Sequence, residues 1–146
     1  MANKPILFTA RTDGSAVPTG YIGEEKIHTA TIAYVAASGA KTVAKVENIG
    51  KGVWEISGLV FVNASTGAGK NYGMYISTVD NGSAGSVAGL SQATSVVGST
   101  GEEYGTLSFP PFNIVVTSDT ESRYLVIGST AISASVAGTL RLKRVG

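Results

Sequence analysis

The stretch Gly67-Ala68-Gly69-Lys70 is the part of the sequence that most resembles a site for chemistry. A phosphate-binding loop has the pattern G-x-x-x-x-G-K-[ST] between a strand and a helix, because its glycine amides surround the phosphate and its lysine neutralises it. In this chain Ala64 stands at the first glycine position, Asn71 stands at the hydroxyl position, and a strand is expected to follow. We therefore expect a hairpin loop here and no cofactor.

The titratable residues also give little support to catalysis. His28 is the sole histidine and the chain has no cysteine, whereas zinc sites and general bases use several such groups together. Neighbours on a strand face opposite ways, so neither Glu24-Glu25 nor Glu102-Glu103 forms a two-carboxylate site. Asp80-Asn81-Gly82 and Asp119 lack the ligand spacing of a calcium loop. We expect no enzyme and no metal, with one alternative: a three-fold oligomer could place three copies of His28 around a metal ion.

Composition excludes further classes of function. Among 146 residues, 11 Lys and Arg oppose 10 Asp and Glu, so no excess positive charge is available for nucleic acid or an anionic membrane. No run of 18 apolar residues predicts a transmembrane helix. Charged residues form 14% of the chain, against about 25% on average in soluble proteins. A surface so poor in charge indicates that other protein covers it.

The elements that position these residues are predicted to be strands throughout. Short alternating or β-branched runs recur about every ten residues between Gly-, Pro- and Asn-rich turns, which indicates a β-sandwich or barrel. We predict an all-β antiparallel β-sandwich of jelly-roll type, with an immunoglobulin-like sandwich as the rival. The expected strands are 25–35, 42–49, 53–62, 72–79, 91–97, 106–109, 112–117, 123–133 and 138–145.

The strand at 53–62 carries the strongest signal. Its even positions place Trp54 and three aliphatic residues on one face, which predicts a core strand, while its odd face becomes apolar only toward the end. Gly58 within it predicts a bulge or a close approach of another backbone.

The chain is expected to divide into an N-terminal arm over residues 1–20 and one sandwich domain over residues 21–146. Pro5 and Pro18 disfavour helix in the arm, so we expect it to be extended. Ile6, Leu7 and Phe8 are three apolar residues beside a polar linker, and we expect them to bind a partner by adding a strand to an exposed sheet edge.

Three segments together resemble a group of tailed-bacteriophage virion domains with a jelly-roll fold. Residues 18–24 (PTGYIGE) match an opening G-x-x-G-E turn, and residues 52–61 (GVWEISGLVF) match a strand containing a tryptophan and S-G. Residues 123–128 (RYLVIG) and 138–145 (GTLRLKRV) match a Y-L-V strand and a final arginine-bearing strand. The likeness covers residues 18–146, while the stretch 83–101 has no counterpart.

The resemblance implies a virion structural protein that forms oligomers, with a trimer favoured. Because no long shaft precedes the domain, we expect a capsid decoration (cement) protein on the capsid exterior, bound to the major capsid protein or other virion subunits. We expect Arg141, Lys143 and Arg144 of the last strand to contact subunits. The alternatives are a tail-fibre or receptor-binding module that holds a cell-surface glycan on exposed tyrosines, and a non-viral carbohydrate-binding or adhesion domain or an enzyme with an unrecognised site.

Overall fold

A computed structural model describes residues 19–35, 39–64, 70–82, 91–96, 103–128 and 133–146. The segments outside these ranges include the arm residues Ile6, Leu7 and Phe8, as well as Gly67-Ala68-Gly69 and Glu102. Over the described residues the chain forms nine strands: β1 (Glu25–Tyr34), β2 (Lys41–Val46), β3 (Gly52–Ala64), β4 (Lys70–Ser77), β5 (Ser91–Val96), β6 (Glu103–Ser108), β7 (Phe112–Val116), β8 (Arg123–Gly128) and β9 (Ala134–Arg144).

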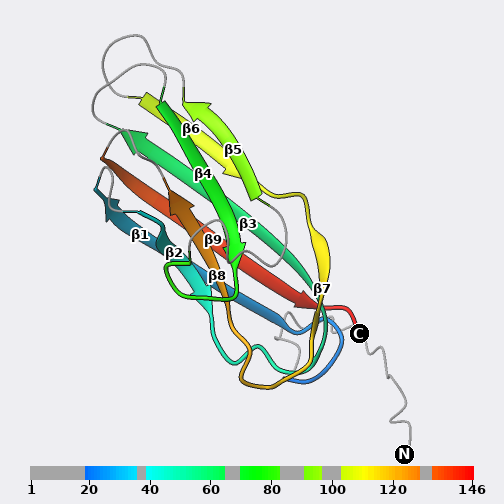
Figure 1. The fold of residues 1–146 in the computed structure, drawn as a ribbon. Helices are drawn as coiled ribbons and strands as arrows, with labels where there is room; N and C mark the ends of the chain where they lie inside the picture. The colour runs from blue at the N-terminus through cyan, green and yellow to red at the C-terminus, as the bar shows by residue number, and fades with distance from the viewer. Residues whose placement is uncertain (1–18, 36–38, 65–69, 83–90, 97–102, 129–132) are drawn as a thin grey trace, which may run out of the picture.

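The strands form two antiparallel sheets that pack face to face (Figure 1). Sheet A has the order β1-β9-β3-β6, and β7 pairs with the other half of β3 beside β6. Sheet B has the order β2-β8-β4-β5. When β6 and β7 are taken as one interrupted strand, this is the eight-strand order of a jelly roll. The predicted all-β jelly-roll sandwich is therefore confirmed, and the immunoglobulin-like alternative is wrong.

The core lies between the sheets and follows the two-residue period of the strands. In β3, Trp54, Ile56, Val60 and Val62 are fully buried, as the sequence predicted. They face Met74, Ile76, Leu125 and Ile127 of sheet B within one continuous cluster. Burial of this apolar surface is the main force that holds the two sheets together.

Glycines allow the two sheets to approach closely. A Cβ at Gly58 would lie 3.0 Å from Leu125 Cδ1, and one at Gly138 would lie 2.5 Å from Val43 Cγ1. The register of β3 with β9 runs without a shift through Gly58, but on the other side of β3 the register shifts by one residue between the β7 and β6 pairings, opposite Ser57 and Gly58. The predicted irregularity at Gly58 is therefore present, although the extra residue lies in the opposing segment between β6 and β7. The atoms nearest to Gly58 belong to side chains, so the alternative of a close approach by another backbone stays a prediction. A second shift in register lies in β2, between Thr42 and Ala44.

The predicted start of the last strand is wrong. The sequence predicts strands at 123–133 and 138–145, whereas Ser133 lies outside any strand and β9 begins at Ala134. The part of the first prediction at 129–132 lies outside the described residues. The small residues at the start of β9, which are a weak strand signal, pair with the last four residues of β1 and of β3. Pairing with two long strands therefore overrides a local preference that looks like a loop.

Candidate interaction surface

Glu24, Trp54 and Arg144 meet at the end of the sandwich where the chain enters β1 and leaves β9. Trp54 and Arg144 are direct cross-strand partners of β3 and β9. The guanidinium carbon lies 4.4 Å from the centre of the Trp54 ring, and Arg144 Nε donates to Glu24 Oε2 at 3.1 Å. Glu24 is 4% exposed and Arg144 is 8% exposed. This is a buried ion pair covered by an indole ring, which we call the Glu24–Trp54–Arg144 cluster.

The carboxylate of Glu24 also fixes the chain before β1. Its Oε2 accepts a hydrogen bond from the Gly20 amide at 2.7 Å, and its Oε1 lies 3.7 Å from Lys26 Nζ. Lys26 Nζ donates in turn to the Asn48 carbonyl at 2.9 Å. One buried carboxylate therefore attaches the first described residues to the body of the sandwich.

The guanidinium of Arg144 fixes the chain before β3. It donates to the Lys51 carbonyl, and Trp54 Nε1 donates to the Gly50 carbonyl at 2.9 Å. A side chain at Gly52 would overlap this guanidinium, and Gly52 has a φ of 146°. Only glycine therefore fits between the backbone and the arginine.

The cluster joins the segments that resemble phage virion domains. Glu24 closes the opening turn, Trp54 belongs to the central strand and Arg144 belongs to the last strand. Sequence reasoning grouped Arg144 with Arg141 and Lys143 as a partner-binding end. The alternation of β9 carried the missed signal, because position 144 shares the face of the buried Leu140 and Leu142.

The other basic residues of β9 face outward. Arg141 forms an ion pair with Glu25, and Lys143 is exposed opposite Glu25 and Glu55. Contact of these two side chains with a partner stays a prediction. Arg144 is buried within the cluster, so its contacts are with residues of the same chain. Ile6, Leu7 and Phe8 lie outside the described residues, so their docking also stays a prediction.

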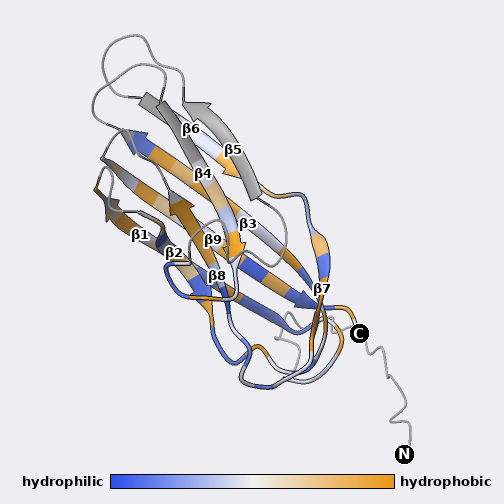
Figure 2. Cartoon of the chain, viewed as in Figure 1, coloured by the Kyte–Doolittle hydropathy of each residue, from blue (hydrophilic) through white to orange (hydrophobic). Residues whose placement is uncertain are grey.

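The outer face of sheet A divides into a charged end and an uncharged end. Figure 2 shows the hydrophilic colour of β9 gathered toward its C-terminal end. Further along the strands, three consecutive cross-strand rows contain no charged residue and are exposed or half-buried. We call these rows the uncharged face: Thr29, Thr31, Ala33, Thr139, Ala137, Ser135, Leu59, Phe61, Asn63, Ser108 and Thr106.

Two large apolar side chains lie in the middle of the uncharged face. Leu59 is 48% exposed and Phe61 is 42% exposed on adjacent outward positions of β3. The hydroxyls of Thr29 and Thr139 are hydrogen-bonded to each other at 2.9 Å across the face. An exposed surface of this kind, without charge and with apolar residues at its centre, is typical of protein contacts.

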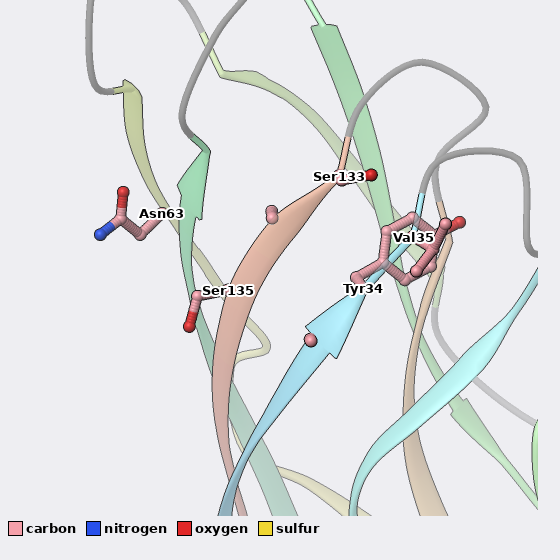
Figure 3. A pocket seen from close by; sticks show the side chains of 7 residues that line it. Tyr34, Val35, Asn63, Ser133 and Ser135 are labelled. Atoms are coloured by element: carbon pink, nitrogen blue, oxygen red, sulfur yellow. The ribbon is translucent and has the colours of Figure 1, made fainter.

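The face ends in a shallow depression of about 470 Å³, lined by Ala33, Tyr34, Val35, Asn63, Ser133, Ala134 and Ser135. Figure 3 shows Asn63 and Ser135 on one side of β9 and Tyr34 on the other. Tyr34 is 1% exposed, and its hydroxyl donates to the Gly39 carbonyl. Its ring is therefore part of the core and is not an open stacking platform.

The four tyrosines whose side chains the structure describes do not gather at one loop end. Tyr21 is exposed beside the Glu24 end, Tyr34 is buried at the opposite end, and Tyr75 and Tyr124 are half-buried on sheet B. The tyrosine platform of the glycan alternative is not formed by these four residues.

His28 has a structural contact. Its Nδ1 accepts a hydrogen bond from the Lys45 amide at 3.1 Å, which links β1 of sheet A to β2 of sheet B. Glu24, just before β1, is buried and Glu25 is exposed, so the two carboxylates face different environments. Within the described ranges, no three His, Asp or Glu side chains are grouped so as to hold a metal ion.

Glu121 organises the turn between β7 and β8. Its Oε1 accepts hydrogen bonds from the Thr117 amide at 2.7 Å, the Thr117 hydroxyl at 2.8 Å and the Ser118 amide at 2.9 Å, and its Oε2 is 3.0 Å from Arg123. These bonds, chiefly those from Thr117, lower the pKa of Glu121 from 4.5 to about 2. In the same turn Asp119 accepts the Lys51 amide, so the turn supports the loop that holds Arg144.

No described helix has the length and apolar character needed to span a membrane.

No protein-family model matches the sequence, and no curated protein matches it. Two virus structures are among the solved structures that give a match. A chain of the infectious bursal disease virus Gx strain is 18% identical, with a TM-score of 0.42 over 86% of this chain. This chain spans only about a third (34%) of that one. A chain of the cyanophage Pam1 capsid asymmetric unit is 15% identical, with a TM-score of 0.40 over 97% of this chain and 99% of that one.

Proposed function

We propose that the chain is a non-enzymatic structural protein of a phage virion, which binds the outside of the assembled capsid as an oligomer and stabilises it. The observation that carries the proposal is the uncharged face. Leu59 and Phe61 lie exposed at its centre, and water alone is a poor partner for such a surface. We infer that protein covers this face in the working assembly.

The sequence resemblance gives further support. Its segments are far apart along the chain, yet Glu24, Trp54 and Arg144 from three of them form one buried cluster. Residues that depend on one another in this way behave as a unit, so the shared pattern is better explained by a common domain than by ordinary β-sandwich composition. A decoration role also fits a chain with 14% charged residues, because shell contacts need broad surfaces of low charge.

The glycan-binding alternative has weaker support. The depression beside Asn63 and Ser135 offers hydroxyl and amide groups, but Tyr34, the tyrosine among its described lining residues, is buried. Sugar recognition on β-sandwiches by stacking needs an open aromatic ring. We therefore place capsid decoration first.

Sedimentation with empty capsid shells from the source of the gene tests the proposal. We expect the wild-type chain to sediment with shells at a saturable ratio, and the Leu59→Asp variant to stay in the supernatant. Val79→Asp is the matched control, because Val79 is equally exposed but lies in the turn after β4. If the wild-type chain does not sediment with shells but binds a glycan array, the receptor-binding function takes the place of this proposal.

A further inference from the structure

The two edges of sheet A differ. At one edge, the residues that separate β6 from β7 are Phe109, Pro110 and Pro111. Proline has no amide hydrogen and cannot donate to a neighbouring strand. The Phe109 amide turns inward and donates to the Gly58 carbonyl at 3.0 Å. This edge therefore cannot accept a continuous added strand.

The edge of sheet B at β2 is also blocked. β2 is six residues long, contains a register shift, and exposes Lys41 and Lys45. Side chains of the same molecule bind two of its amides: Asn81 Oδ1 accepts from Thr42 at 2.9 Å, and His28 Nδ1 accepts from Lys45. Short length, lysines and irregular register are the usual means by which proteins prevent edge pairing.

The β1 edge of sheet A lacks the prolines, the short length and the register shift that block the other two edges. His28, which binds the Lys45 amide of β2, is its one side chain already engaged with a neighbouring edge strand among the described contacts. β1 is ten residues long and pairs with β9 along its whole length without a shift. From Thr29 to Tyr34 it contains no charge and no proline, and Thr29 and Thr31 are exposed. Among the described strands, only β9 pairs with it. Such an edge is a template for an additional strand.

The chain itself contains a segment that fits this edge. Of the segments outside the described residues, 1–18 is the longest, and its residues 5–10 (PILFTA) are uncharged and mostly apolar. Eighteen extended residues reach at most about 60 Å. The root of this segment is fixed beside Glu25 by the bond from Gly20 to Glu24, at the N-terminal end of β1. Length and polarity therefore allow residues 5–10 to lie along a β1 strand.

The uncharged face bears on whether residues 5–10 come from the same molecule or from a second copy. Neighbouring strands lie about 4.8 Å apart, so a strand added beside β1 remains about 15 Å from β3. It cannot cover Leu59 and Phe61. A second molecule placed with its arm at the edge and its body against the adjoining face would cover both sites.

We propose that residues 5–10 of a second copy of this chain add to the free edge of β1 as an antiparallel strand, and that the body of that copy covers the uncharged face. The contact joins copies of the protein and goes beyond attachment to a shell. A wild-type oligomer that does not sediment with shells would contradict the proposed function alone, and a wild type that sediments with shells but is monomeric in solution would contradict this inference alone.

Sedimentation velocity of the full chain over a range of concentrations is the first test. We expect an oligomer whose self-association weakens by roughly tenfold or more in Thr31→Lys and in Leu7→Asp, because a charge at the edge or in the arm opposes strand addition. Thr78→Lys and Ala16→Asp are the matched controls, one exposed beyond β4 and one in the linker, and both should associate as the wild type does. Far-UV circular dichroism checks that each variant is folded.

Cross-linking separates contact between copies from contact within one. Since the chain has no cysteine, Thr31→Cys and Leu7→Cys chains can be mixed and treated with a short bismaleimide. We expect a link between residues 7 and 31 of different chains, and none when Thr78→Cys replaces Thr31→Cys. Three results would each overturn the proposal. The wild type could be monomeric, the 7–31 link could form only within a double-cysteine monomer, or the oligomer could associate equally well with Thr31→Lys.

Discussion

The Arg144 guanidinium and the Glu24 carboxylate form an ion pair at 3.1 Å between residues that are 120 positions apart in sequence, and both are almost fully buried. The pair ties the first strand of the domain to the last. Trp54 covers the guanidinium and both charged side chains are buried, so water has little access to either partner.

Truncation of Arg144 is expected to destabilise the domain strongly. Arg144→Ala removes the nearer of the two cations beside the buried Glu24 and leaves Lys26 Nζ at 3.7 Å, so we expect a loss of up to about 3–5 kcal/mol of unfolding free energy. Arg141→Ala, which breaks the exposed pair with Glu25, should cost no more than about 1 kcal/mol. Urea unfolding followed by circular dichroism measures both. Equal losses in the two variants would show that the Glu24–Trp54–Arg144 cluster is not what holds this end.

Leu59 and Leu140 provide a matched pair on opposite faces of sheet A. Leu140 is fully buried, so Leu140→Ala should lose about 2–5 kcal/mol of unfolding free energy. Leu59 is 48% exposed, and Leu59→Ala should lose less than about 1 kcal/mol in the isolated chain. Chemical unfolding at low protein concentration makes the comparison. A large loss for Leu59→Ala would mean that this side chain is already covered within one molecule.

The close approach of the sheets at Gly138 can be tested by adding one methyl group. Gly138→Ala places a Cβ 2.5 Å from Val43 Cγ1, and we expect overpacking to cost about 1–3 kcal/mol. Val43→Ala removes the opposing methyls, so the double variant should be more stable than the sum of the two single changes predicts. A double-mutant cycle by thermal and urea unfolding measures this coupling. Strict additivity would contradict the contact.

Glu121 should give the domain a defined acid sensitivity. Its folded pKa, about 2, is below the ordinary value of 4.5, so its contribution to stability is complete above pH 4.5 and is lost as the pH falls toward 2. Glu121→Gln cannot ionise, so the stability difference between wild type and variant should shrink over that window. Urea unfolding at several pH values from 7 to 2 measures the difference. A constant difference would show that Glu121 titrates normally in the folded chain.

The sequence predicts the fold much better than it predicts the contacts. The alternation of Trp54, Ile56, Val60 and Val62 identifies a core strand, because a period of two reports directly which face is buried. By contrast, nothing local in the sequence pairs Glu24 with Arg144. Such a contact depends on the strand order, which brings β1 and β9 together.

The uncharged face was missed for a related reason. The alternation of β3 places Leu59 and Phe61 together on its odd face, but their neighbours Thr31, Ala137 and Thr106 come from three distant segments. An uncharged surface depends on which residues of neighbouring strands lie side by side, and this is known only once the strand register is known. The basic residues of β9 are hard to predict for a similar reason, because Lys143 is exposed while the adjacent Arg144 is buried.

The position of Trp54 makes this protein its own optical reporter. The chain contains one tryptophan, and its ring is fully buried against the Arg144 guanidinium at the end from which the arm leaves. Emission from the indole therefore reports on that end of the sandwich alone. If residues 19–24 detach before the sheets unfold, the fluorescence transition will come at a lower denaturant concentration than the circular dichroism transition. The interval between the two transitions then measures how firmly residues 19–24 are attached, separately from the stability of the domain.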